Sequence, residues 1–131
     1  MKVYISGPMR GYPQFNFPAF DEAAAQLRAQ GYEVFSPAEH DRETGFDPDR
    51  LAEVTPAELR EMLAWDCARI LESDLVALLP GWSSSLGAML EVHLARTVGI
   101  PCRLFSGGMF RLSIDLVDAA ACLLDKLTDL E

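Results

Sequence analysis

The sequence predicts a single-domain α/β protein with an open parallel sheet, of flavodoxin or Rossmann type, and helices on both faces. Short apolar runs typical of buried strands alternate with longer segments of helical period, and Gly- and Pro-rich turns separate them. The chain has 131 residues, of which 50% are hydrophobic, so it can form one core without disulfide bonds or a structural metal ion. We expect one domain over 1–131, with its core in 1–105 and a C-terminal helix over 109–128.

The first expected strand, residues 2–6, ends at the turn Gly7-Pro8-Met9-Arg10-Gly11. Asn16 is expected to cap a helix to about residue 30, with an inner stripe of Phe17, Phe20, Ala24 and Leu27. The loop has neither the dinucleotide glycine pattern nor a P-loop ending, so it indicates neither a dinucleotide nor a triphosphate. Arg10 suits a single phosphate, unless it is only a surface arginine.

The second expected strand, 32–36, leads into a polar loop to about residue 50, either a lid or a mobile segment. His40 in this loop is a candidate ligand contact or a solvated side chain. Thr55-Pro56-Ala57-Glu58 predicts a helix start. Asp66 falls within the apolar stripe of that helix, which comprises Leu59, Met62, Leu63, Ile70 and Leu71. A carboxylate there is costly unless it is bonded or used, so Asp66 is either a satisfied structural residue or part of a site.

The stretch from Ser73 to Glu91 reads as a buried strand, a Pro-Gly turn, three serines and a helix to about residue 98. Ligands of parallel α/β sheets bind at such a junction. Glu91 lies four residues after Gly87 and seven after Ser84, so the three are expected on one helix face. Gly87 leaves that face open to a ligand. Glu91 is thus a candidate for chemistry, with a solvated surface role as the alternative.

A fourth strand is expected over 101–105, and the last helix is apolar on more than one side, which suggests a second copy of the chain as partner. If the first and third strands are neighbours, the loop 7–11 and the turn 83–87 meet at one crevice. That arrangement would bring together Arg10, the serines, Asp66 and Glu91.

Charge and composition exclude several classes of protein. A net charge of −9 argues against binding a nucleic acid polymer. Cys67, Cys102 and Cys122 are odd in number and widely spaced, which predicts reduced thiols, a cytoplasmic location and no metal site. No signal peptide and no membrane-spanning run are expected, nor is any cofactor.

Four blocks carry a family resemblance that extends from Val3 to about Phe105. They are Val3–Gly11, Ala38–His40, Met62–Asp66 and Ser73–Glu91. In this order they resemble the nucleoside 2-deoxyribosyltransferase-like superfamily, including its deoxynucleoside 5′-monophosphate N-glycosidase branch. The likeness is closest to the DUF4406-type group of phage and bacterial proteins.

The resemblance implies roles for particular residues. Glu91 would be the nucleophile at the anomeric carbon, Asp66 would assist the departing base, and Tyr4 would hold the Glu91 carboxylate. The residues implied to bind substrate are Gly7, Met9, Arg10, Gly11, Ser85 and Gly87 around the 5′-phosphate and His40 near the base. Base specificity is expected from Phe15, Asn16 and the loop 42–50. Members of the family are dimers or larger, and a neighbouring chain completes the site.

The chain departs from the characterised branches at Pro8 and in the insert 12–16. The leading hypothesis is an enzyme that cleaves the N-glycosidic bond of a 2′-deoxynucleoside 5′-monophosphate or deoxynucleoside through a covalent deoxyribosyl intermediate. One alternative is a transferase that exchanges bases, and a second is a non-catalytic nucleotide-binding or sensing module. A third is a structural or interaction protein. Two carboxylates facing an anionic ligand favour catalysis.

Overall fold

The structure, a computed structural model, describes residues 1–47 and 54–113. Its five-stranded sheet has the order β2-β1-β3-β4-β5. Four strands are parallel: β1 (Lys2–Ser6), β2 (Glu33–Phe35), β3 (Leu75–Leu78) and β4 (Cys102–Ser106). The edge strand β5 (Met109–Ser113) is antiparallel to β4. The predicted neighbourhood of the first and third strands is confirmed, since Val3 to Ser6 pair with Leu75 to Leu78.

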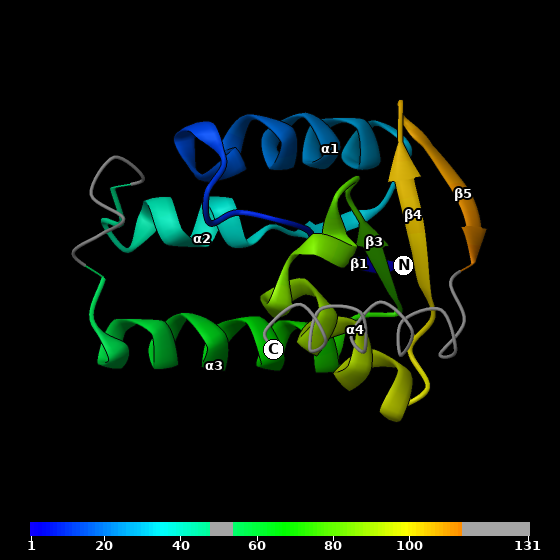
Figure 1. Cartoon of the computed structure of the whole chain (residues 1–131). Coiled ribbons are helices and arrows are strands. Elements are labelled where there is room, and N and C mark those ends of the chain that lie inside the picture. The colour runs from blue at the N-terminus through cyan, green and yellow to red at the C-terminus, as the bar shows by residue number, and fades with distance from the viewer. Residues whose placement is uncertain (48–53, 114–131) are drawn as a thin grey trace.

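Helices cover both faces of the sheet, as predicted (Figure 1). Helix α1 (Phe17–Ala29) packs on one face, and α3 (Pro56–Glu72) and α4 (Leu86–Thr97) lie on the other. Because side chains alternate along a strand, β1 contributes to both cores. Val3 and Ile5 join the cluster under α1, whereas Tyr4 joins the cluster under α4.

Two local predictions of helix structure are confirmed. Thr55 caps α3, and its side chain accepts a hydrogen bond from the Glu58 amide at 3.2 Å. The inner stripe of α1 is buried as expected: Phe17, Phe20, Ala24 and Leu27. The apolar stripe of α3 is different, because Ile70 is its only buried member while Leu59, Leu63 and Leu71 are exposed.

The expected polar loop after the second strand is instead helical over α2 (Pro37–Glu43). Ser36 has the extended conformation of an N-cap, and Pro37 occupies the first turn, where its missing N–H costs nothing. Residues 48–53 of the expected loop lie outside the described part of the chain.

The prediction of a helix from residue 109 is wrong for residues 109–113, which form β5 instead. Gly107 and Gly108 both have positive φ, +61° and +77°, which is what a two-residue hairpin turn requires. Phe110 then packs edge-on against Phe105 at 5.0 Å and Tyr32 at 5.9 Å, so the strand buries an aromatic ring that a helix would have turned elsewhere. The rest of that expected helix, residues 114–128, and Cys122 lie outside the described residues.

Within the described segments, no helix has both the length and the apolar character that crossing a membrane requires. The two described cysteines, Cys67 and Cys102, are free thiols, in agreement with the sequence prediction for them.

Candidate active site

The loops that follow β1 and β3 are in contact, as expected from the neighbouring positions of these two strands. A Cβ atom on Gly7 would lie 2.8 Å from Leu79 Cβ. A Cβ atom on Gly81 would lie 2.7 Å from the Tyr12 hydroxyl and 3.2 Å from Pro8 Cγ. Gly81 also has φ +88°, so both the backbone conformation and the lack of room for a Cβ atom favour glycine at this position. The two loops are therefore held together by close backbone approach.

Glu91 lies on the second turn of α4 and is 8% exposed. Its Oε1 atom accepts a hydrogen bond of 3.2 Å from the Ser6 hydroxyl at the end of β1. Tyr4, two residues earlier on the same face of β1, is completely buried. Its phenol lies close enough to Glu91 and Asp66 for both carboxyls to raise the tyrosine pKa, after burial itself. The structure thus brings together the predicted trio of Tyr4, Asp66 and Glu91.

Several buried oxygens in this group have no hydrogen-bond partner among the described residues. They are the Tyr4 hydroxyl, Asp66 Oδ1 and Glu91 Oε2. Leaving such atoms unpaired in a folded core costs about 1–3 kcal/mol each, so a group of three in one place makes this region the candidate active site.

Burial raises the pKa of both carboxyl groups, Asp66 and Glu91. The charge of Glu91 raises the pKa of Asp66 further, whereas the nearby hydroxyls of Tyr4 and Ser6 lower the pKa of Glu91. One proton therefore resides preferentially on Asp66 while Glu91 is the more readily ionised carboxyl. An acid beside an ionised carboxylate is the arrangement that nucleophilic displacement at a sugar carbon requires.

The sequence reasoning missed three residues of this region. Ser6 could have been found from its two-residue spacing after Tyr4, which places both side chains on one face of β1. Asp41 is 2% exposed on α2, and its charge raises the pKa of Asp66 and of Glu91. Trp65 stacks face to face on His40, with ring centroids 4.0 Å apart and an interplanar angle of 5°.

His40 is half-buried on α2, and its stack on Trp65 forms an aromatic surface between α2 and α3. Burial lowers the His40 pKa, so its ring is neutral at physiological pH. A neutral stacked imidazole is a suitable neighbour for a flat aromatic base.

The loop between β1 and α1 has an unusual backbone. Gln14, Phe15 and Asn16 all have positive φ, between 53° and 59°, a conformation that costs about 1–2 kcal/mol for each non-glycine residue. Phe15 anchors the turn, since its buried ring packs against Phe46 at 5.1 Å. Asn16 precedes α1 as predicted but its side chain does not cap the helix; its amide instead donates to the Pro8 carbonyl at 2.7 Å. Asn16 therefore secures the loop that carries Arg10.

The remaining predicted phosphate residues lie around the two loops. Arg10 is exposed and forms no ion pair with the described residues, so its guanidinium is available. Ser85 caps α4, accepting from the Ala88 amide at 3.2 Å, and its hydroxyl proton remains free to donate. Gly87 is exposed, and a Cβ there would meet only Ser85 Oγ, at 3.8 Å. Ser84 belongs to a short 3-10 turn, Trp82–Ser84, rather than to the face of α4.

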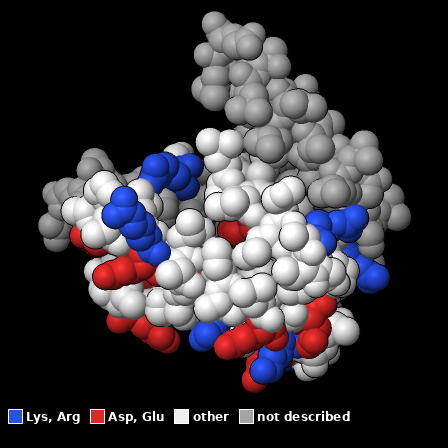
Figure 2. All heavy atoms as spheres, turned by 90° about the horizontal axis from the view of Figure 1, so that it is seen from below, with Lys and Arg blue, Asp and Glu red and all other residues white. Residues whose placement is uncertain are grey.

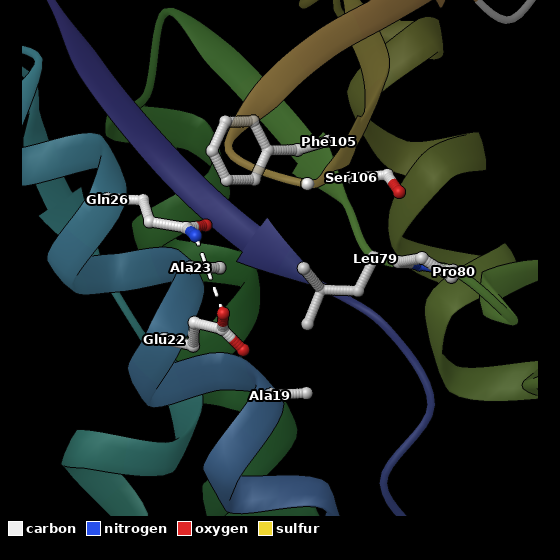
Figure 3. A pocket seen from close by; sticks show the side chains of 9 residues that line it. Ala19, Glu22, Ala23, Gln26, Leu79, Pro80, Phe105 and Ser106 are labelled. Carbon is white, nitrogen blue, oxygen red and sulfur yellow. Dashed lines mark hydrogen bonds between the residues drawn. The ribbon is translucent and has the colours of Figure 1, made fainter.

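A cavity of about 200 Å³ lies on the opposite, α1 side of the sheet, at the ends of β3 and β4 (Figure 3). Leu79 and Phe105 form its apolar wall, and Glu22 and Gln26 of α1 point toward it. Asp66 and Glu91 do not line it. The described residues also contain no group of three His, Cys, Asp or Glu side chains that could hold a metal ion.

Comparisons with known proteins agree with this description. The family model described as "Domain of unknown function (DUF4406)" matches residues 1–103. The solved structure of a 2-deoxyribosyltransferase from Bacillus psychrosaccharolyticus superimposes with a TM-score of 0.60 at 22% identity, over 89% of this chain and 79% of that one. A search of curated proteins finds no significant match. The structural likeness establishes a shared fold.

Proposed function

Since the chain belongs to the DUF4406 family and has the fold of a 2-deoxyribosyltransferase, we propose that it is an enzyme acting on the N-glycosidic bond of a 2′-deoxynucleoside 5′-monophosphate or deoxynucleoside. The observation that carries this proposal is the buried group of Tyr4, Asp66 and Glu91, with unpaired oxygens and with Glu91 held by Ser6. A module that only bound an anionic nucleotide would gain nothing from two buried carboxyls.

The chemistry follows from the protonation of the group. The Glu91 carboxylate attacks C1′ of the deoxyribose, a C1′–O bond forms, and the electron pair of the C1′–N bond leaves with the base. The proton held by Asp66 passes to the departing base, which leaves neutral. Water then attacks C1′, the Asp66 carboxylate takes its proton, and the Glu91 carboxylate is released with a free sugar or sugar phosphate. A second base attacking in place of water would make the reaction a transfer.

Two features support the monophosphate as substrate. Arg10 is an exposed cation on the loop after β1, and Ser85 and the open Gly87 begin α4. A helix N-terminus with a hydroxyl is a suitable environment for a phosphate dianion, and a guanidinium on the loop after β1 would add a fixed positive charge. Arg10→Ala should therefore weaken binding of monophosphates far more than that of nucleosides. Equal losses for both would remove the phosphate assignment.

The first experiment incubates the protein with the four deoxynucleoside monophosphates and their nucleosides, with and without a second free base, followed by chromatography. Release of a free base indicates a hydrolase, and a new nucleoside that needs the second base indicates a transferase. Glu91→Gln should abolish turnover while ligand-induced thermal stabilisation survives. Glu61→Gln, an exposed glutamate of α3, is the matched control. Full activity of Glu91→Gln would refute the mechanism.

We further propose that the protein self-associates through the outer faces of α3 and α4. Four leucines are exposed there, with exposed fractions of 38–62%: Leu59 and Leu63 on α3, Leu86 and Leu90 on α4. Figure 2, which views the molecule from the side where these helices lie, shows a largely uncharged central area with most charges toward the rim. Several large apolar side chains exposed on neighbouring helices are typical of protein interfaces.

A further inference from the structure

The cavity on the α1 side of the sheet is bounded by three segments that are distant in sequence (Figure 3). Helix α1 forms one side, Leu79 and Pro80 after β3 form another, and the end of β4 with Gly107 forms the third. Its volume is about 200 Å³. At about 30 Å³ per water in the liquid, this is room for about seven waters or for one small ring system. Pockets for drug-sized ligands measure about 300–1,000 Å³, so this cavity suits a smaller molecule.

The apolar wall of the cavity is held in place by the core. Leu79 and Phe105 are 4% and 2% exposed, and the Phe105 ring packs edge-on against Phe110 at 5.0 Å. Gln30, which follows α1, donates its side-chain amide to the Gly108 carbonyl at 2.8 Å and so ties the hairpin to the helix. These contacts keep the space open without a ligand, as is usual for binding pockets.

Two polar side chains of α1, Glu22 and Gln26, point toward the cavity (Figure 3). They are four residues apart, so they share one face of the helix. The Gln26 Nε2 atom donates to Glu22 Oε1 at 3.5 Å, which is long for a hydrogen bond. Glu22 forms no ion pair with the described residues, whereas its neighbour Asp21 pairs with Arg42 at 2.8 Å. The Glu22 carboxylate therefore retains acceptor capacity for another molecule.

The charge of the cavity wall restricts what can bind there. No cation lines the cavity among the described residues, and Arg111 instead donates to the Ser106 carbonyl at 3.2 Å. Glu22 is exposed to solvent, so its carboxylate lies at the rim of an otherwise mostly apolar space. A carboxylate only accepts hydrogen bonds, and it can accept two parallel N–H bonds from one planar group. Glu22 would repel an anion, and a purely apolar molecule would gain nothing from it.

We propose that this cavity binds a flat aromatic ring whose edge carries two adjacent N–H donors. The ring would contact the apolar wall of Leu79 and Phe105, and the two donors would bind the Glu22 carboxylate at the rim. Aromatic amidines have such an edge, and so does guanine, in which the N1–H group lies beside the 2-amino group. Asp66 and Glu91 do not line the cavity, so this binding is independent of the proposed N-glycosidic activity.

The test titrates the ¹⁵N-labelled protein with benzamidinium, benzamide and benzoate and follows its amide signals by NMR. The three probes are rings of similar size that are cationic, neutral and anionic. Benzamidinium should shift the signals of Ser106 and Gly107, benzamide should bind about fivefold more weakly, and benzoate should not bind. Absence of benzamidinium binding at millimolar concentration, or equal affinity for benzamidinium and benzoate, would overturn the proposal.

Substitutions on α1 locate the bound probe. Glu22→Gln should weaken benzamidinium binding about tenfold because the charge is lost, whereas Asp21→Asn next to it should have no effect. Ala19 is half-buried and lines the cavity, so Ala19→Leu should fill the space and abolish binding. Ala25→Leu, at an exposed position of the same helix, is the control. Wild-type affinity in Glu22→Gln or in Ala19→Leu would overturn the proposal.

Guanine and thymine distinguish two sources of this chemistry. Guanine carries the paired donors on a neutral ring, whereas thymine has a single N–H between two carbonyls. Shifts of the Gly107 signal with guanine would support the proposal and identify a nucleobase as ligand. Binding of benzamidinium without guanine would support it with a cationic amidine as ligand. Thymine binding as tightly as guanine would refute the requirement for paired donors.

Discussion

Gly87→Ala should make the protein more stable and less active at the same time. Gly87 lies in the first turn of α4 with an ordinary helical backbone, it is exposed, and an added Cβ would meet only Ser85 Oγ at 3.8 Å. Replacing such a glycine by alanine lowers the entropy of the unfolded chain and stabilises a helix by about 0.5–1 kcal/mol. For a chain of this size that corresponds to a rise of about 2–5 °C in Tm.

The loss of activity has a different cause. In the proposed site the substrate phosphate lies against the bare backbone at the start of α4, so a methyl group there occupies the place of the ligand. A misplacement of about 1 Å can reduce turnover by about a hundredfold. Urea denaturation measures the first effect, and kcat/KM for the preferred monophosphate measures the second.

Gly99→Ala provides the matched control. Gly99 also has nothing within 4 Å of an added Cβ, but its φ is +81°, so alanine there should destabilise the fold by about 1 kcal/mol. It lies after the far end of α4 and should leave kcat/KM unchanged. Wild-type kcat/KM in Gly87→Ala would refute the placement of the ligand over Gly87, and a lower Tm would refute the description of the helix start.

Three further outcomes are expected. Ser6→Ala removes the hydrogen bond to Glu91 and should lower kcat by about ten- to a hundredfold, while the acid limb of the pH profile moves to higher pH; an unchanged kcat and limb would exclude the positioning role. Burial raises the pKa of Asp41 to about 6, above its unfolded value, so the folded state binds the proton more tightly and loses stability as pH rises from about 4 to about 6. The free energy of unfolding of Asp41→Asn, measured by urea denaturation, should therefore rise by about 2 kcal/mol relative to that of the wild type between pH 4 and pH 7. A difference between the two proteins that does not change with pH would contradict this. Leu63→Lys should abolish self-association in sedimentation experiments, whereas Ala25→Lys, at an exposed position of α1, should not; a monomeric wild type would refute the interface.

The strained turn before α1 is stabilised by contacts that also hold the loop that carries Arg10. The left-handed backbone of residues 14–16 is unfavourable, but it allows Phe15 to enter the aromatic cluster with Phe17 and Phe46 and Asn16 to hold Pro8. The loop with Arg10 is thus held by the apolar packing of Phe15 at one end and by the close contact of Gly81 with Pro8 and Tyr12. Strain of this kind is characteristic of functional sites.

Much of the architecture was determined by local sequence patterns. The apolar runs of β1, β3 and β4 and the stripe of α1 correspond to the observed core, and the cap at Thr55 begins α3 as predicted. The parallel order of strands follows from their alternation with helices, because a right-handed crossover returns each strand to the same sheet. The candidate carboxyls were also found from local patterns: Asp66 because it interrupts an apolar stripe in which a charge is costly, and Glu91 because of its spacing after Ser84 and Gly87 at a strand–helix junction.

What tertiary structure decided depends on contacts between distant residues. Ser6 and Glu91 are 85 positions apart, and no local period shows that one orients the other. Asp41 resembles its exposed neighbours in sequence, and only the completed fold buries it. The hairpin after Gly108 likewise forms because Phe110 finds Phe105 and Tyr32, overriding the helical pattern of the residues that follow. Local patterns select elements because propensity and periodicity act over a few residues, whereas burial and the proton affinity of a carboxyl are set by whatever the completed fold places beside it.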